Sequence, residues 1–201
     1  LEEARIFFEF NQTDNDLGVH VSLDGEDWRQ LAIEDPGGKV IFAVKGTAGF
    51  GEFGMTELFF EGAEPSLDDV PLDELLDRFP EGEYEFSGRT VDGNEIEGEA
   101  TFTHAVPNGP AVSTEVGPNH LVRIHWTPVP GVPPGFPTRE IAITGFQVIV
   151  GSFQVTLPAP ATAVTLPPEF VAALGTGEHG FEVLAIEEGG NQAITASSFN
   201  L

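Results

Sequence analysis

The sequence predicts an all-β protein with two β-sandwich domains in tandem, the first of which carries one short helix. The 201 residues include 24 glycines and 16 prolines, which favour many turns and short strands over long helices. Phenylalanine occurs 17 times, and aromatic side chains suit the cores of sheets. Short apolar runs also recur between turn signals, and 40% of the residues are hydrophobic, enough for real cores.

The first part of the chain is predicted to be a series of strands, over residues 4–10, 18–23, 28–33, 39–45 and 55–61. Asp24-Gly25 is a strong signal for a two-residue hairpin turn. We therefore expect residues 28–33 to run back along residues 18–23. A second turn is expected at residues 35–38, which read DPGG.

Residues 46–54 form a glycine-rich loop that contains Phe50 and Phe53. A phosphate-binding loop is excluded, because the Gly-Lys-Ser/Thr ending is absent and the surroundings are acidic. We expect a flexible hairpin connection with both rings tucked in. The alternative is that the two rings are exposed and contact a sugar or a protein, since aromatic side chains favour binding surfaces.

One helix is predicted, over residues 66–79. Its apolar side chains are spaced i, i+3, i+4 and i+7 and share one face: Leu72, Leu75, Leu76 and Phe79. Ser66 offers a cap, Pro71 suits a first helical position, and Pro80 ends the helix. A helix this short is not stable alone, so it must pack on a sheet.

Two alternating strands follow, over residues 83–89 and 95–104, with a turn at residues 92–94 between them. Tyr84 and Phe86 face the core, while Glu83 and Glu85 face water. This hairpin resembles the last two strands of many bacterial immunoglobulin-like modules. The resemblance implies an immunoglobulin-like sandwich for residues 1–106.

The acidic composition stops at residues 107–110, which read PNGP, and this predicts a boundary between domains over residues 1–106 and 107–201. From residue 110 onward the chain resembles a fibronectin type III domain. The matching runs are residues 121–126 with Trp126, 143–150 with Phe146, 163–166, 181–185 and 189–191. His179 occupies the position of the tyrosine that forms a conserved corner in this family. Histidine lacks the hydroxyl that makes the hydrogen bond of that corner. The resemblance implies a seven-stranded sandwich that serves as a spacer or binding module, without catalytic residues.

The charge is strongly acidic and uneven. There are 33 acidic and 8 basic residues, and 26 of the acids lie within residues 1–105. Such a field repels phosphate backbones and anionic lipid surfaces, so neither is an expected partner. It attracts divalent cations, but solubility in a salty medium explains the same charge equally well, and both interpretations stay open.

The sequence holds no cysteine, which excludes disulfides, thiolate metal sites and cysteine nucleophiles. No apolar run approaches the about 20 residues of a membrane span. The five histidines are isolated, without the spacing of a zinc motif: His20, His104, His120, His125 and His179. The chain begins at Leu1 rather than methionine, as a mature or trimmed fragment would, so the lack of a visible signal peptide says little about the compartment. We expect an extracellular or periplasmic protein.

The residues Asn11, Asp14, Asn15 and Asp16 cluster oxygen ligands in one loop, and Ca²⁺ takes six to eight such ligands. We expect Asp35 or Glu61 to complete this set, because meander connections would bring their ends of the sheet to the loop. The helical calcium loop does not fit the spacing. His20 is a candidate neighbour of this site, or a histidine that simply faces solvent. The other interpretation of the loop is an Asx turn whose side chains bind its own backbone.

These observations predict a non-catalytic secreted or surface protein that binds or scaffolds, with a Ca²⁺ site in its acidic N-terminal domain. Catalysis is not expected, because no nucleophile, base and orienting group occur together in a recognisable motif. One alternative is a carbohydrate-binding accessory module that uses Phe50, Phe53 or Trp28. Another is a purely structural spacer of a larger surface protein. A protein or glycan ligand is compatible with the binding protein and with the carbohydrate-binding module.

Overall fold

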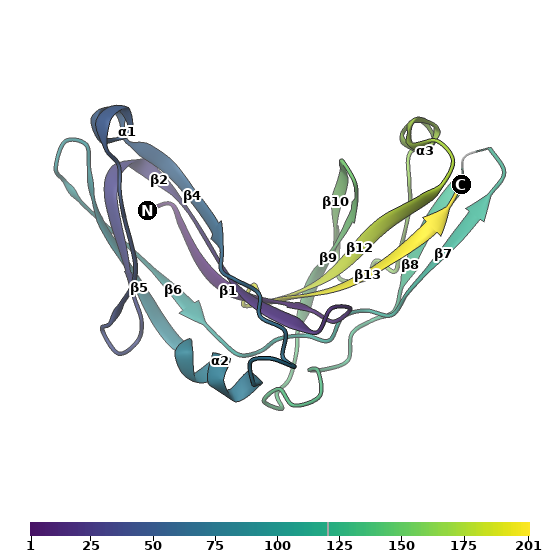
Figure 1. The fold of residues 1–201 in the computed structure, drawn as a ribbon, viewed down its shortest axis with the longest axis horizontal. Coiled ribbons are helices and arrows are strands. Elements are labelled where there is room, and N and C mark those ends of the chain that lie inside the picture. The colour runs from purple at the N-terminus through teal and green to yellow at the C-terminus, as the bar shows by residue number, and fades with distance from the viewer. Residues whose placement is uncertain (120) are drawn as a thin grey trace. The chain divides into compact units, whose positions relative to one another are not determined.

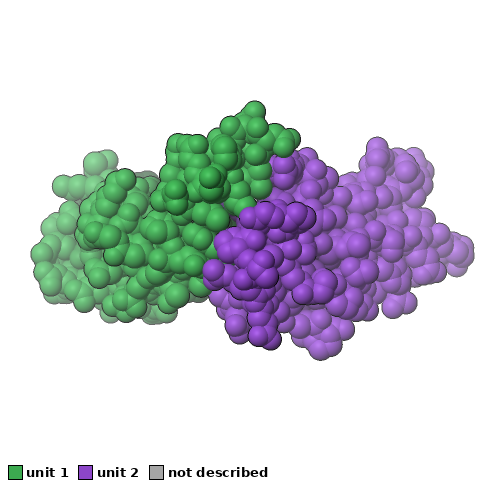
Figure 2. All heavy atoms as spheres, turned by 90° about the horizontal axis from the view of Figure 1, so that it is seen from below, with its two compact units in different colours: residues 1–8, 18–104 green, residues 9–17, 105–201 purple. Residues whose placement is uncertain are grey.

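The computed structural model describes residues 1–119 and 121–201, so that His120 lies outside the described residues. The chain divides into two compact units, shown in different colours in Figure 2. Unit 1 comprises residues 1–8 and 18–104, and unit 2 comprises residues 9–17 and 105–201. Strands dominate both units, which confirms the predicted all-β class.

The elements of the first half of the chain, most of them labelled in Figure 1, are six strands and two short helices. They are β1 (Glu3–Asn11), β2 (Asp16–Glu34), β3 (Val40–Lys45), α1 (Ala48–Phe53), β4 (Met55–Glu61), α2 (Leu72–Arg78), β5 (Gly82–Thr90) and β6 (Glu95–Phe102). The predicted strands 4–10, 39–45 and 55–61 are confirmed as β1, β3 and β4.

The hairpin predicted at Asp24-Gly25 is wrong, because β2 continues through it as one strand of 19 residues. The Asp-Gly pair lies in an irregularity, where the register of β2 with β4 shifts between Asp24 and Trp28. The Glu2 amide also donates to the Asp24 carbonyl at 2.9 Å, so the N-terminal segment is hydrogen-bonded to the backbone at this point. A bulge of this kind bends a strand without reversing it, and the fully buried Trp28 ring follows at once.

The glycine-rich loop is also placed differently from the prediction. β3 pairs with residues 30–34 of β2, and β4 pairs with residues 20–28 of the same strand, both antiparallel. β3 and β4 therefore run in the same direction beside successive parts of β2. The helix α1 connects them end to end and does not close a hairpin. The rings are not tucked in: Phe50 is 68% exposed and Phe53 81%.

The predicted helix is confirmed but begins later, at Leu72, and Leu75 is its buried side chain. Proline disfavours helical geometry in the residue before it, which explains why the helix starts only after Pro71. The β5–β6 hairpin is confirmed with a regular register from Gly82 opposite Phe102 to Arg89 opposite Glu95.

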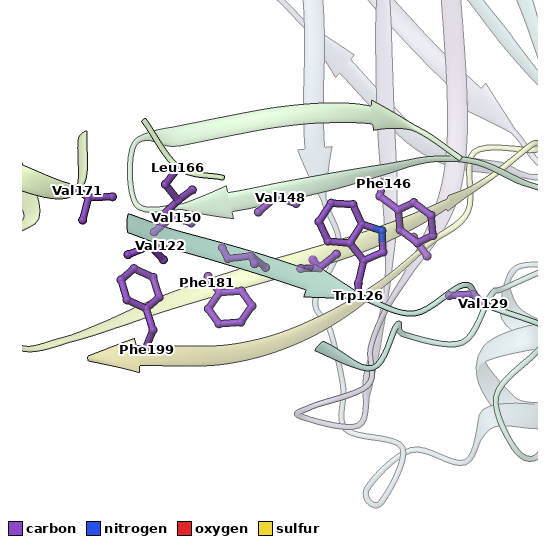
Figure 3. Close-up of a cluster of buried hydrophobic side chains, with 13 residues drawn as sticks. Val122, Trp126, Val129, Phe146, Val148, Val150, Leu166, Val171, Phe181 and Phe199 are labelled. Carbon is purple, nitrogen blue, oxygen red and sulfur yellow. The ribbon is translucent and has the colours of Figure 1, made fainter. Parts of the chain in front are cut away.

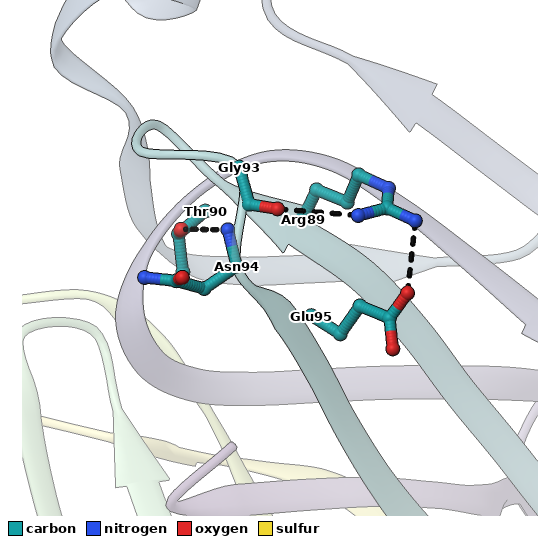
Figure 4. A network of polar contacts seen from close by, with 5 residues as sticks. All are labelled: Arg89, Thr90, Gly93, Asn94 and Glu95. Atoms are coloured by element: carbon teal, nitrogen blue, oxygen red, sulfur yellow. Dashed lines mark hydrogen bonds and ion pairs between the residues drawn. The ribbon is translucent and has the colours of Figure 1, made fainter.

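Polar contacts close the turn of the β5–β6 hairpin (Figure 4). Arg89 donates to the Gly93 carbonyl at 3.1 Å and pairs with Glu95 at 2.9 Å, while the Asn94 amide donates to the Thr90 hydroxyl at 3.0 Å. These contacts hold the strand ends at the turn, where Gly93 has a φ of 89° that suits glycine.

Among the described residues of the second half of the chain, unit 2 contains seven strands and one helix. They are β7 (Val112–Gly117), β8 (Leu121–Trp126), β9 (Ile143–Val150), β10 (Phe153–Pro158), β11 (Ala163–Thr165), α3 (Pro168–Leu174), β12 (Glu178–Glu187) and β13 (Gln192–Asn200). In one sheet these strands have the order β10-β9-β12-β13, and the sheet continues past β13 into β1; the other sheet has the order β11-β8-β7. This is the arrangement that the resemblance to fibronectin type III domains implied, and the seven-stranded sandwich is confirmed.

The core of unit 2 lies between these two sheets (Figure 3). Trp126 of β8 packs against Phe146 of β9, with ring centroids 5.6 Å apart. Val148 and Val183, from adjacent strands, are fully buried. The runs whose residues carried the resemblance therefore supply the side chains of this core.

Each unit contains a corner in which a strand side chain donates a hydrogen bond to the carbonyl of the residue four positions upstream. In unit 1 the Tyr84 hydroxyl donates to the Pro80 carbonyl at 3.0 Å, four residues upstream. In unit 2 the Nε2 of His179 lies 3.1 Å from the Gly175 carbonyl, again four residues upstream. A carbonyl oxygen only accepts, so Nε2 donates, and the imidazole replaces the hydroxyl that the sequence lacks here. Each corner joins a short helix to the strand that follows it.

Candidate functional site

The loop at residues 11–16 is held by the side chain of Asn11. Its Oδ1 accepts hydrogen bonds from the Thr13 amide at 3.0 Å and the Asp14 amide at 3.2 Å, and its Nδ2 donates to Asp14 Oδ2 at 3.0 Å. Asn15 takes a left-handed conformation with φ of 56°, which asparagine tolerates. The Asx-turn interpretation of this loop is therefore present in the structure, and Asn11 uses its amide inside the loop.

Asp16 is the residue of this loop whose carboxylate is poorly accommodated. Its Oδ1 is buried and has no hydrogen-bond partner among the described residues. Burial raises the pKa of Asp16, and the charge of Asp14 raises it further. Two carboxylates that repel one another, one with a buried and unbonded oxygen, form an arrangement that a bound cation would stabilise.

The loop belongs to unit 2 and is fixed to the last strand of the chain. Residues 9–11 pair in parallel with residues 192–194 of β13. The hydroxyl of Thr13 accepts from the Ala196 amide at 2.8 Å, and Gln12 Oε1 accepts from the Gly109 amide at 2.9 Å. The positions of Asp14 and Asp16 are therefore set by the sheet of unit 2.

The two residues proposed to complete the calcium set both lie in unit 1. Asp35 Oδ1 accepts from the amides of Gly37 and Lys39, both at 2.9 Å, and so stabilises its own turn. Glu61 lies at the end of β4, directly opposite His20 of β2. The structure thus gives Asp35 a role in its own turn and places Glu61 beside a different candidate group.

His20 lies at the centre of that second group. It is 5% exposed, and its ring lies 5.2 Å from Phe7 and 6.0 Å from Phe59 between centroids. Its Nε2 is 3.6 Å from Glu64 Oε1. Burial lowers the pKa of His20 and the charge of Glu61 opposes this shift, so the neutral imidazole is favoured.

Within unit 1, His20 and Glu64 bring two possible metal-ligand atoms together, since Nε2 and Oε1 lie 3.6 Å apart. A histidine nitrogen and a carboxylate oxygen are common metal ligands in proteins. The chemistry of this donor set does not identify calcium. The interpretation of His20 as a solvent-facing residue is wrong, since its side chain is buried.

Two glycines explain how Glu64 reaches His20. A Cβ at Gly18 would lie 2.5 Å from the Cγ of Glu64, so the glutamate side chain occupies the space that a side chain at residue 18 would fill. The amide of Gly62 donates to the Val19 carbonyl at 2.8 Å and holds the segment after β4 against β2. The sequence offers no local signal for this contact, because Glu64 is 44 residues from His20.

Exposed aromatic side chains lie on α1 and β4 in unit 1. Besides Phe50 and Phe53, Phe59 is 64% exposed, and the half-buried rings of Phe42 and Phe60 stack with centroids 4.4 Å apart. Trp28, in contrast, is fully buried. The expectation that Trp28 contacts a sugar is therefore wrong, whereas the exposure required of Phe50 and Phe53 is met.

No protein-family model and no curated protein matches this sequence. Among solved structures, a segment of two fibronectin type III domains from chicken tenascin is 10% identical with a TM-score of 0.35, over 99% of this chain and 98% of that one. The fibronectin(III)-like modules of CbhA from Clostridium thermocellum are 12% identical with a TM-score of 0.32, over 98% and 91%.

The spore cortex lytic enzyme SleM of Clostridium perfringens is 16% identical with a TM-score of 0.36. The match covers 48% of this chain and 28% of the enzyme. At these scores the likenesses carry no argument about function, and the fold assignment rests on the sheet order of unit 2. Among the described residues, no helix has the length and apolar character needed to cross a bilayer.

Proposed function

We propose that this chain is a non-catalytic binding or scaffold protein that acts outside the cytoplasm and binds Ca²⁺ at the loop of residues 11–16. The observation that carries the cation site is Asp16 Oδ1, which is buried without a hydrogen-bond partner among the described residues, next to the repelling charge of Asp14. The protein ligands are Asp14, Asn15 and Asp16, with Asn11 positioning Asp14 through its amide.

Calcium fits this loop better than a transition metal, because every side-chain donor in it is an oxygen or an amide. A bound ion would neutralise both carboxylates and tie the start of β2 to the loop that is fixed on β13. The expected role is structural: the ion adds stability to unit 2 by mass action, about 2.7 kcal/mol when its free concentration is 100 times its dissociation constant.

Calorimetric melting of the whole chain tests this site, with millimolar CaCl₂ compared with chelator. We expect Ca²⁺ to raise the melting temperature of the wild type and to have little effect on D16N. The variant D77N removes one carboxylate from the exposed face of α2 and should keep the full response. A wild-type melt that does not move at millimolar Ca²⁺ would remove the calcium proposal.

A second candidate function is supported by the exposed rings of Phe50 and Phe53, which fit a contact with a glycan or a protein. A groove of about 590 Å³ lies on the same unit, and Gln30, Lys45, Arg89 and Glu97 contribute polar groups to it. A glycan-array screen compares the wild type with the double variant F50A/F53A. Hits that persist in the double variant, or no hits at all, would argue against a role of these rings in sugar binding.

A further inference from the structure

We propose that unit 1 holds a second and chemically different metal site, in which His20, Glu64 and Glu61 bind a transition-metal ion of the Zn²⁺ class. This site is separate from the oxygen-ligand loop at residues 11–16 and goes beyond the calcium-binding function. Its core is the pair of His20 Nε2 and Glu64 Oε1.

The separation of these two atoms is slightly longer than that of two ligands on one ion. They lie 3.6 Å apart, which is longer than a normal hydrogen bond. Zinc binds nitrogen and carboxylate oxygen at about 2.0–2.1 Å, so two ligands of a tetrahedral zinc ion lie about 3.3 Å apart. A movement of a few tenths of an ångström would bring the two atoms to that spacing.

The register of the sheet offers the third ligand. Glu61 of β4 is the direct partner of His20 of β2 in the antiparallel register. Side chains at such positions point to the same face, with Cβ atoms about 4.5–5.5 Å apart, which is within reach of a glutamate carboxylate. The site therefore combines two neighbouring strands with the segment that follows β4.

The surroundings suit a bound ion. His20 is 5% exposed, and the rings of Phe7 and Phe59 pack against the imidazole and restrict its rotation. A side chain that is already fixed loses less conformational entropy when the ion binds, so binding costs less free energy. Gly18 keeps the space over β2 open for Glu64. The nitrogen donor favours Zn²⁺ and related ions over Ca²⁺, which prefers oxygen.

The chain contains a matched pair that lacks these features. His125 Nε2 lies 3.8 Å from Glu115 Oε2, but the side chains are 37% and 62% exposed. The two pairs have the same chemistry and nearly the same separation. A comparison between the two pairs therefore shows whether metal binding requires the buried arrangement around His20 or occurs at any surface histidine next to a glutamate.

The test is calorimetric titration of the whole chain with ZnCl₂ after dialysis against chelator. We expect one equivalent of Zn²⁺ to bind, with the affinity at least tenfold lower in H20Q and in E64Q and unchanged in H125Q. No binding by the wild type, or equal binding by H20Q and the wild type, would overturn the proposal.

Two further measurements keep the result clear if H20Q does not fold. Glu64 is 29% exposed at its side chain, so E64Q should fold and still lose affinity. Co²⁺ in place of Zn²⁺ should give the visible absorption of a four-coordinate site in the wild type and in D16N but not in E64Q. Retention of the Zn²⁺ site in D16N would show that the two metal sites are independent, whereas its loss would refute this separate site.

Discussion

The corner of unit 1 gives the sharpest test of how this fold is held together. Tyr84 is fully buried, and its hydroxyl donates to the Pro80 carbonyl at 3.0 Å, next to the end of α2. The variant Y84F removes one oxygen atom and leaves the ring packing against Phe102 in place. Its effect therefore reports on this hydrogen bond.

The expected loss is about 1–3 kcal/mol. A neutral hydrogen bond contributes about 1 kcal/mol net, and a carbonyl left buried without a partner costs about 1–3 kcal/mol. In a domain of the size of unit 1, each kcal/mol lowers the melting temperature by about 4–8 °C. The matched variant H179F acts on the partly exposed corner of unit 2 and should lower the transition of that unit instead.

A pH series adds a second readout. Burial raises the pKa of Tyr84, and the charge of Asp35 raises it further. A group whose pKa is raised in the folded state contributes its stability below the ordinary pKa of 10 and loses it as the pH rises. Urea unfolding should show a wild-type advantage at pH 8 that shrinks above pH 10. An unchanged midpoint for Y84F at pH 8 would refute the reasoning.

Three other expectations follow from the burial or exposure of single side chains. Because the pKa of Asp16 is raised, its ionisation costs stability as the pH rises above about 4; in chelator, D16N should melt higher than the wild type at pH 7, and the difference should vanish near pH 3. Ile124 is fully buried in the core of unit 2, so I124A should lose about 2–5 kcal/mol in urea unfolding, and a loss below 1 kcal/mol would contradict the core assignment. Phe53 is 81% exposed, so F53S should change stability by less than about 0.5 kcal/mol, and a larger loss would show that the ring packs on the fold.

The sequence was informative where neighbouring residues decide the structure. Alternation and a turn predicted the β5–β6 hairpin, because Tyr84 and Phe86 face the core while Glu83 and Glu85 face water. The strand runs around Trp126 and Phe146 likewise identified the sandwich of unit 2. Both rest on short-range patterns that the fold reproduces.

The sequence misled where tertiary contacts override a local signal. Asp24-Gly25 has the composition of a hairpin turn, yet the backbone of the N-terminal residues pairs with it and the strand continues. The helix α1 arises within a glycine-rich run, where helix propensity is low. Propensity is a weak prior in both places, because the flanking strands fix the path of the chain.

The candidate sites show the same division. The acidic loop of residues 11–16 was visible as a cluster in the sequence, but its assignment to unit 2 depends on a parallel pairing with residues 192–194. Glu64 was missed altogether, because its contact with His20 requires the open space over Gly18. No pattern within a short window contains that information.

The parallel pairing of Glu9 with Gln192 has a consequence for biosynthesis. Residues 9–11 pair with residues 192–194, so a ribosome must have synthesised the chain beyond residue 194 before this ladder can form. Pairings so distant in sequence form late and slow the folding of a domain. A single proteolytic nick after residue 104 should leave the two pieces associated, because residues 9–17 remain bound among the strands of the other fragment.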